Sequence, residues 1–181
     1  MDTEDRCSDR FEISEMLHRY AEAVDTIGSA PSEPQANDPA VQRATELFNE
    51  CMTPTAQVTL YFDGPDSEAT HAPSEGPLAF ARWVRAYFHQ YGYVGTYHLV
   101  GNIRPRFVDR DAAIVTSYIN STHWLADGRM LLAPIEYTDS AQRSRDGNWR
   151  ITTRKLIVLR WWVTDGYFAA PGDPTLSRPA G

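Results

Sequence analysis

The spacing of apolar side chains predicts three helices in the first half of the chain. In residues 8–28, apolar residues recur at steps of three and four, the period of a helix with one buried face. Ser8 or Asp9 is placed to cap its start. Residues 39–51 and 77–91 show the same period and predict a second and a third helix. The apolar positions of the first helix are Ile13, Met16, Leu17, Tyr20, Val24 and Ile27.

Beyond residue 91 the pattern changes to one typical of β-strands. Val, Ile, Thr, Tyr and Trp concentrate in four runs, and Asp-Gly pairs in two of the separators predict hairpins. The four strands are expected at residues 95–109, 111–126, 129–143 and 148–163. An earlier strand is predicted at residues 56–62. Loops are expected at residues 28–39, before the second helix, and at residues 63–76, after this strand. Three helices followed by a meander predict an α+β fold, in which a strongly curved sheet wraps over the helices and encloses a conical cavity.

Composition and charge narrow the classes of function. The 181 residues fit one domain, residues 1–166, and the Pro/Gly-rich residues 167–181 are interpreted as a tail. A net charge of -7 argues against nucleic acid and anionic membranes as partners. No apolar run approaches the length of about 20 residues that a membrane helix needs, and the polar N-terminus does not resemble a signal peptide, so we expect a cytoplasmic protein.

Metal and disulfide chemistry are not expected. The two cysteines, Cys7 and Cys51, are too few for a disulfide framework or a zinc site and are interpreted as free thiols. No set of His, Asp and Glu residues has the spacing of metal ligands. We therefore expect no metal and no cofactor.

His98 lies in a predicted strand between apolar residues, where the common interpretation is a buried histidine that serves packing. Because Leu99, Ile103 and Phe107 form the apolar face, a regular strand would place His98 on the other face. A bulge at Gly101 would turn it inward. The sequence alone therefore leaves both a packing role and a role in the cavity open.

A second histidine, His123, strengthens the interpretation that His98 faces a cavity. If Arg110 and Asp111 form the hairpin tip, His98 lies directly opposite His123, and a bulge would shift this pairing by one residue. Two imidazoles would then face one cavity. The alternative is a ladder of polar side chains on a solvated face.

Asp25 lies near the end of the first helix, at the edge of its buried face. A carboxylate is disfavoured there by the helix dipole, so a partner is expected. Asp25 is either a solvated residue at the start of the loop or a group that orients His98 and raises its basicity. Tyr20 is either a core residue or a phenol that donates a hydrogen bond inside the cavity. We expect Asp63 to open a loop, and His18, His71 and His89 to lie at the surface.

Three segments, "YAEAVD", "TYHLVGNIRPRFVDRDAAIVTSYINSTHW" and "DGNWRITTRKL", resemble the SnoaL-like, scytalone dehydratase-like branch of the nuclear transport factor 2-like superfamily. The resemblance covers about residues 8–163. It implies that Asp25 and His98 form the dyad shared by dehydratases and a dehydrochlorinase of this superfamily. It also implies catalytic roles for His123, Tyr20 and Arg154.

The chain departs from these dehydratases at two aromatic positions. Val24 stands where one of them has a tyrosine just before its Asp, and Tyr61 lies one position away from another of its tyrosines. These departures put that enzyme's substrate in doubt. We expect Tyr61, Trp124 and Tyr137 to bind substrate.

Together these observations predict a cofactor-independent lyase that eliminates water, and with less support HX, from a cyclic hydrophobic small molecule. An isomerase or a polyketide cyclase would begin with the same proton abstraction. The fold also allows a binding module without catalysis, or the structural small subunit of a ring-hydroxylating dioxygenase. Because "LIVLRWWV", residues 156–163, is too apolar for free solvent, we expect a homo-oligomer, either a dimer or a trimer.

Overall fold

The structure is a computed structural model that describes residues 3–30, 33–62, 67–69 and 74–164. Its helices are α1 (Thr3–Gly28), α2 (Pro39–Cys51) and α3 (Gly76–Gln90), which confirms the three predicted helices. Because α1 begins at Thr3, Ser8 and Asp9 lie inside it, so the expected cap there is wrong. Asp63, His71 and the tail 167–181 lie outside the described residues.

In the described part of the chain, seven strands form one mixed sheet in the order β2-β1-β6-β5-β4-β3, with β7 paired to β5. Strand β1 runs parallel to β6, and the remaining pairs are antiparallel. The short β2 lies inside the segment 63–76 that was predicted as a loop. The strands are β1 (Met52–Phe62), β2 (Ser74–Glu75), β3 (Tyr93–Phe107), β4 (Ala112–Leu125), β5 (Met130–Arg143), β6 (Trp149–Val158) and β7 (Trp162–Thr164).

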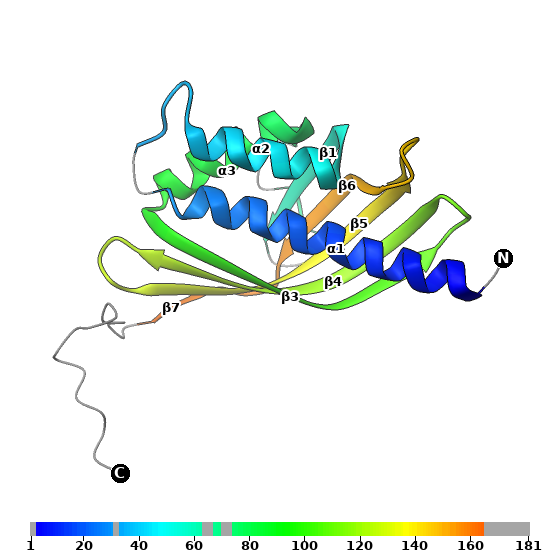
Figure 1. Ribbon diagram of the computed structural model, residues 1–181. Coiled ribbons are helices and arrows are strands. Elements are labelled where there is room, and N and C mark those ends of the chain that lie inside the picture. Colours follow the sequence, from blue (N-terminus) through cyan, green and yellow to red (C-terminus); the bar gives the residue numbers. More distant parts are fainter. Residues whose placement is uncertain (1–2, 31–32, 63–66, 70–73, 165–181) are drawn as a thin grey trace, which may run out of the picture.

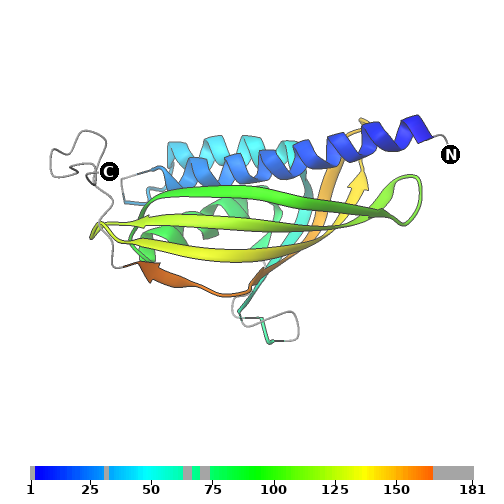
Figure 2. The ribbon, with the colours of Figure 1, turned by 90° about the horizontal axis from the view of Figure 1, so that it is seen from below.

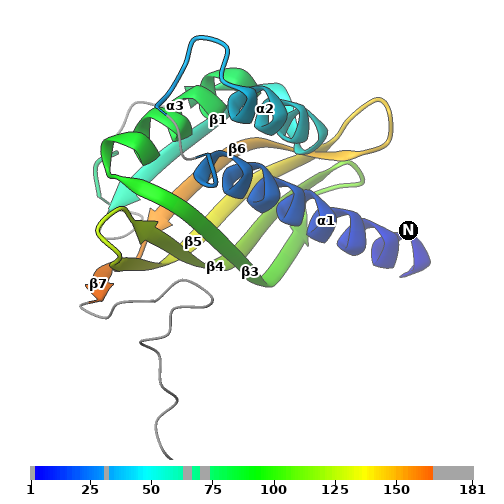
Figure 3. The ribbon, with the colours of Figure 1, turned by 60° about the vertical axis from the view of Figure 1, so that its left-hand side comes forward.

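The sheet curves strongly without closing, and the three helices cover its concave side (Figure 1, Figure 3). Helix α1 follows β3 along the edge of the sheet, with α2 beside it (Figure 2). This is the predicted α+β cone. Among the described residues, no helix has both the length and the apolar character needed to cross a membrane.

The apolar face of α1 packs into the core as its period predicts. The six apolar positions of the predicted helix are each at most 5% exposed. The Tyr20 ring meets Phe48 of α2 and Phe80 of α3 at centroid distances of 5.3 and 5.7 Å. Helix α2 is capped by Asp38, whose carboxylate accepts a hydrogen bond from the Ala40 amide and pairs with the buried Arg85 of α3. The three helices are thus fixed to one another above the sheet.

A bulge in β3 sets which of its side chains face the helices. Gly101 pairs with Tyr118 and Arg104 with Thr116, so two β3 residues stand opposite Ser117 alone. Asn102, in this bulge, has a φ of 50°. The bulge exchanges the two faces of the strand, as expected from its sequence.

The expected register of the β3–β4 hairpin is wrong. Near the hairpin tip, each β3 residue pairs with the β4 residue one position before the expected partner. Beyond the bulge the shift is two positions. His98 therefore pairs with Ser121, and His123 pairs with Thr96. A shift of two residues keeps side chains on the same face, so both histidines still point to the concave side.

The last predicted strand, 148–163, is interrupted. Ile135 of β5 pairs with Val158, and Leu132 pairs with Trp162, so two β5 residues face three residues of the other strand. Pro134 lies at this point and has no N–H to donate to the ladder. It accepts one hydrogen bond from the Leu159 amide, and the regular pairing stops there.

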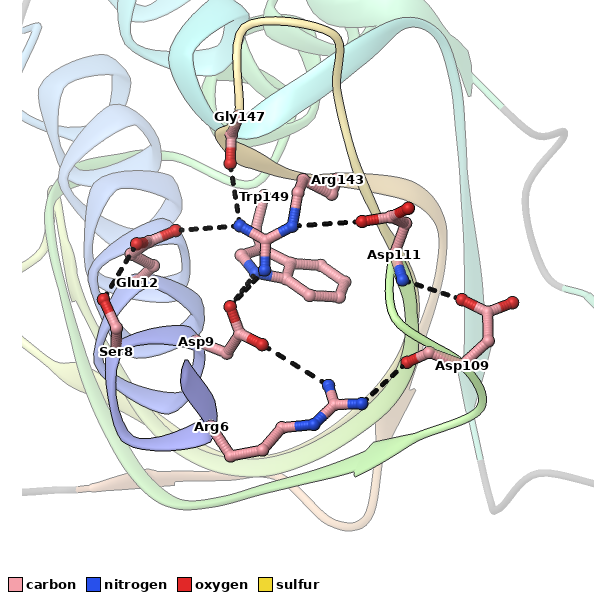
Figure 4. Close-up of polar contacts among 9 residues, drawn as sticks. All are labelled: Arg6, Ser8, Asp9, Glu12, Asp109, Asp111, Arg143, Gly147 and Trp149. Carbon is pink, nitrogen blue, oxygen red and sulfur yellow. Dashed lines mark hydrogen bonds and ion pairs between the residues drawn. The ribbon is translucent and has the colours of Figure 1, made fainter. Parts of the chain in front are cut away.

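At the end of the sheet near the N-terminus, a polar network surrounds Arg143 (Figure 4). Its guanidinium pairs with Asp9 and Glu12 of α1 and with Asp111 in the β3–β4 turn, and it donates to the Gly147 carbonyl. The Asp9 carboxylate also accepts from the Trp149 indole. Asp9 thus ties α1 to β5 and β6 rather than capping the helix.

Candidate active site

A cavity of about 410 Å³ lies between the helices and the concave face of the sheet. It is lined by residues from α1, α3 and five of the strands, and most of them are aromatic or aliphatic. Its polar side-chain groups are two imidazoles, one serine hydroxyl, and the phenol and indole groups of its tyrosine and tryptophan residues. Among the described residues, no Asp, Glu, Lys or Arg lines it. The cavity therefore suits an uncharged, largely apolar small molecule.

Asp25 and His98 are in direct contact at one wall of this cavity. The Asp25 Oδ1 and His98 Nδ1 atoms are 2.7 Å apart, although the residues are 73 positions apart in the chain. Asp25 also accepts hydrogen bonds from the Thr96 hydroxyl and the His98 amide, both at 3.2 Å. With the proton on Nδ1 directed at the carboxylate, Nε2 carries the free lone pair. The contact between Asp25 and His98 is the geometry expected from the sequence.

A glycine allows this contact. A Cβ added to Gly28 would lie 1.4 Å from the Thr96 methyl group, so only glycine lets the end of α1 come this close to β3. Asp25 lies one turn before Gly28 and reaches the strand for that reason. Neither Gly28 nor Thr96 was predicted from the sequence. The sequence does contain a signal for Thr96, because its hydroxyl lies two positions before His98 and therefore on the same face of the strand.

His123 lies beside His98 in an aromatic environment. Its ring centroid is 5.6 Å from that of His98, and its ring stacks on Tyr93 at 4.3 Å. Burial, followed by the nearby His98, lowers the pKa of His123 to about 3. Its Nδ1 is buried and has no hydrogen-bond partner among the described residues. His123 is therefore a neutral imidazole beside His98 at neutral pH.

Tyr20 forms part of the cavity's inner wall. Burial raises the pKa of its phenol well above the ordinary value, so the group stays protonated. The hydroxyl has no hydrogen-bond partner among the described residues. A buried donor of this kind gains free energy when a ligand oxygen enters the cavity. Tyr20 is thus a core residue, and its role as a donor to a ligand stays a prediction.

Arg154, for which the resemblance implies a catalytic role, is not among the residues that line the cavity. Its guanidinium forms a two-pronged pair with Asp139, at 2.7 and 2.6 Å, and both side chains are fully buried. The same group lies over the rings of Tyr20 and Tyr137, 3.7 and 3.9 Å from their centroids. Arg154 thus supports two residues of the cavity wall from behind. Asp139 was missed, although it alternates with Tyr137 and Ala141 on the inward face of β5.

Only one of the three residues expected to bind substrate lines the cavity. Tyr137 does, and it is buried. Tyr61 and Trp124 do not. In a strand, neighbouring side chains point to opposite faces, and Tyr61 stands between the cavity residues Leu60 and Phe62. Trp124 follows the inward-facing His123 and is exposed on the convex face.

The expected surface positions of His18 and His89 are confirmed, since both are exposed. Within the part of the chain that the structure describes, no three His, Cys, Asp or Glu side chains group together as metal ligands.

Comparison with known proteins gives a family and a set of similar folds. Residues 40–155 match the family described as the SnoaL-like domain. No curated protein sequence matches the chain. The hexachlorocyclohexane dehydrochlorinase LinA-type3 from Novosphingobium barchaimii has a TM-score of 0.72 and 19% identity, over 94% of this chain and 100% of that chain. A candidate scytalone dehydratase from Novosphingobium aromaticivorans has a TM-score of 0.66 and 19% identity, over 93% and 95%. The Kfla4162 protein from Kribbella flavida has a TM-score of 0.62 and 25% identity, over 86% and 93%.

Proposed function

The chain belongs to the SnoaL-like domain family, and from this premise we propose that it is a cofactor-independent lyase that eliminates water from a neutral cyclic molecule. The observation that carries the proposal is the Asp25–His98 contact at the wall of an apolar cavity. A carboxylate bound to Nδ1 holds the imidazole in one tautomer and stabilises its charged form. The similar folds of a dehydrochlorinase and a candidate scytalone dehydratase support a reaction of this class.

In the proposed reaction, His98 Nε2 removes a proton from a carbon next to a carbonyl group. The electrons of that C–H bond form the new double bond, and the C–O bond to a hydroxyl group on the neighbouring carbon breaks. The departing oxygen takes up a proton, which the imidazolium of His98 can return, and leaves as water. Tyr20 and neutral His123 are positioned to donate hydrogen bonds to the oxygen that gains charge.

The charges around the cavity favour loss of water over loss of halide. A departing halide needs a cation or several donors, and the described cavity lining contains no Lys or Arg. Arg154, the cation implied by the family resemblance, is paired with Asp139 outside the lining. A departing hydroxyl group needs a proton instead, which imidazole and phenol groups supply.

An isomerase or a cyclase is the alternative, because either would use the same base on the same apolar substrate. The difference lies in what the substrate offers after proton abstraction. A ketone with a hydroxyl group on the β-carbon can lose water, whereas a β,γ-unsaturated ketone can only take the proton back at another carbon. A β-hydroxy ketone paired with a ketone that lacks this hydroxyl group therefore separates loss of water from proton abstraction alone.

The test uses 3-hydroxy-1-tetralone, which gives 1-naphthol when it loses water, and α-proton exchange of 1-tetralone in D2O. We expect the wild-type protein to form 1-naphthol, and His98→Ala to lower the rate by about 10²–10⁴-fold. Asp25→Asn, which keeps the size of the side chain, should also lower it strongly. His89→Ala is the matched control, since His89 is exposed on α3 outside the lining.

Proton exchange without formation of 1-naphthol would favour the isomerase or cyclase. If His98→Ala keeps the wild-type rates of both exchange and elimination while its circular dichroism is unchanged, the proposed base is wrong.

A further inference from the structure

The break between β6 and β7 changes which side chain faces the cavity. Leu156 and Val158 of β6 line the cavity, so regular alternation would bring Arg160 to the next inward position. The extra residue opposite Ala133 and Pro134 shifts the alternation by one. Trp161 lines the cavity in place of Arg160. The bulge therefore exchanges a charged side chain for an indole at this position.

Trp161 stands at the mouth of the cavity. It lines the cavity and is nevertheless 60% exposed, and Tyr91, at the end of α3, is the other strongly exposed lining residue, at 48%. The Tyr91 ring is held against Tyr87 at a centroid distance of 4.5 Å. Two aromatic side chains from distant parts of the chain thus mark the entrance.

We propose that Trp161 is a specificity-determining residue that stacks on a flat, unsaturated ring of a neutral substrate at the cavity mouth. An indole covers a planar ring over a large area and gains from ring–ring interaction in addition to burial. A saturated ring is puckered and offers no π face, so it loses that second contribution. The proposal sharpens the substrate class of the proposed function and shares its cavity.

Binding of two probes with the same carbon skeleton tests this inference without any turnover. The first is 2-naphthol, which is flat, and the second is decahydro-2-naphthol, which is saturated. Neither probe carries the ketone needed for elimination, so the result does not depend on the proposed chemistry. Dissociation constants are measured by isothermal titration calorimetry on the full chain.

We expect the wild-type protein to bind 2-naphthol more tightly than the saturated probe. Trp161→Ala should weaken 2-naphthol binding by about 5-fold more than it weakens binding of the saturated probe, which loses only buried contact area, whereas Trp161→Phe should keep most of the preference. The matched control is Trp162→Ala. Trp162 is also exposed, but it pairs with Leu132 and does not line the cavity.

Equal losses for both probes in Trp161→Ala would overturn the inference, because Trp161 would then act only as a hydrophobic cover. An unchanged affinity for 2-naphthol in Trp161→Ala, an equal effect of Trp162→Ala, or a wild-type protein that binds neither probe would also overturn it.

Discussion

His98 and His123 are neighbours with opposite surroundings, and this difference can divide the work of an elimination between them. The carboxylate of Asp25 accepts the Nδ1 proton of His98 and can balance a positive charge on that ring. The ring of His123 packs against Tyr93 and Phe88, and its Nδ1 has no hydrogen-bond partner among the described residues. A base that gains a proton therefore stands beside an imidazole that stays neutral.

The buried, neutral state of His123 predicts a stability that depends on pH. Its pKa is lowered from 6.5 to about 3 in the fold, so below pH 6.5 the unfolded chain binds a proton that the folded chain does not. Folding stability should therefore fall as the pH drops through this window, by up to about 1.4 kcal/mol per pH unit. His123→Asn lacks this pH-dependent loss of stability. The free energy of unfolding of the wild type minus that of the variant should therefore decrease as the pH falls.

Urea unfolding at several pH values between about 7 and 5 measures this difference. His18→Asn, on the exposed face of α1, is the control for loss of an imidazole at the surface. A difference between wild type and His123→Asn that stays constant over this range would contradict the buried neutral state.

At single positions, the sequence shows which residues carry chemically active groups more reliably than it shows which residues surround them in the fold. Asp25, His98, Tyr20 and His123 were found because each interrupts an apolar period or matches the family resemblance. The resemblance implied a role for Arg154 but not its burial, which depends on Asp139 in another strand. Tyr61 and Trp124 were expected to bind substrate, yet the alternation of a strand decides which face a ring occupies.

At the scale of elements, two bulges decide what the cavity contains. The bulge in β3 turns His98 inward, and the bulge between β6 and β7 turns Trp161 inward. Hydrophobic periods predict where helices and strands lie, because burial of one face determines them. They predict register poorly, since one extra residue in a turn or bulge shifts every later pairing.

The β3 bulge contains a residue with a costly backbone conformation, which predicts its sensitivity to substitution. Asn102 has a φ of 50°, which asparagine tolerates and a β-branched residue does not. Asn102→Val should lower the free energy of unfolding by about 1–2 kcal/mol, and Asn102→Gly should not lower it. Chemical denaturation of the three proteins measures these changes.

The control for this prediction is Gly101→Ala at the neighbouring position. A Cβ there meets no atom within 4 Å, and no positive φ is required. Gly101→Ala should therefore change the free energy of unfolding little. Equal stability of Asn102→Val and the wild type would show that the bulge does not need the left-handed conformation.

At the scale of the whole molecule, the two ends of the cone are built differently. Around Arg143, charged and polar groups join α1 to the turns of the sheet (Figure 4). The opposite end contains the histidines and the exposed aromatic residues of the cavity mouth. Asp9 and Asp25 stand on the same helix, about 24 Å apart at 1.5 Å per residue. One end can thus fix α1 while the other remains open to a ligand.

The convex face of β3 and β4 predicts self-association. Tyr97, Leu99, Tyr118 and Trp124 are exposed there, on adjacent antiparallel strands. Apolar side chains grouped on a sheet face are typical of an interface. We therefore expect a homo-oligomer, either a dimer or a trimer, whose mass in light scattering at micromolar concentration is a multiple of the 20.4 kDa chain mass.

The double variant Leu99→Lys with Tyr118→Lys should shift this mass to that of the monomer, because two charges on each copy would meet in the interface and lose their hydration. Phe11→Lys is the matched control, since Phe11 is 67% exposed on α1, away from the convex face, and should leave the mass unchanged. A wild-type protein with the mass of one chain would contradict the prediction. An oligomer that survives the double variant would place the interface on another surface. Loss of the oligomer with Phe11→Lys alone would place it at the helices.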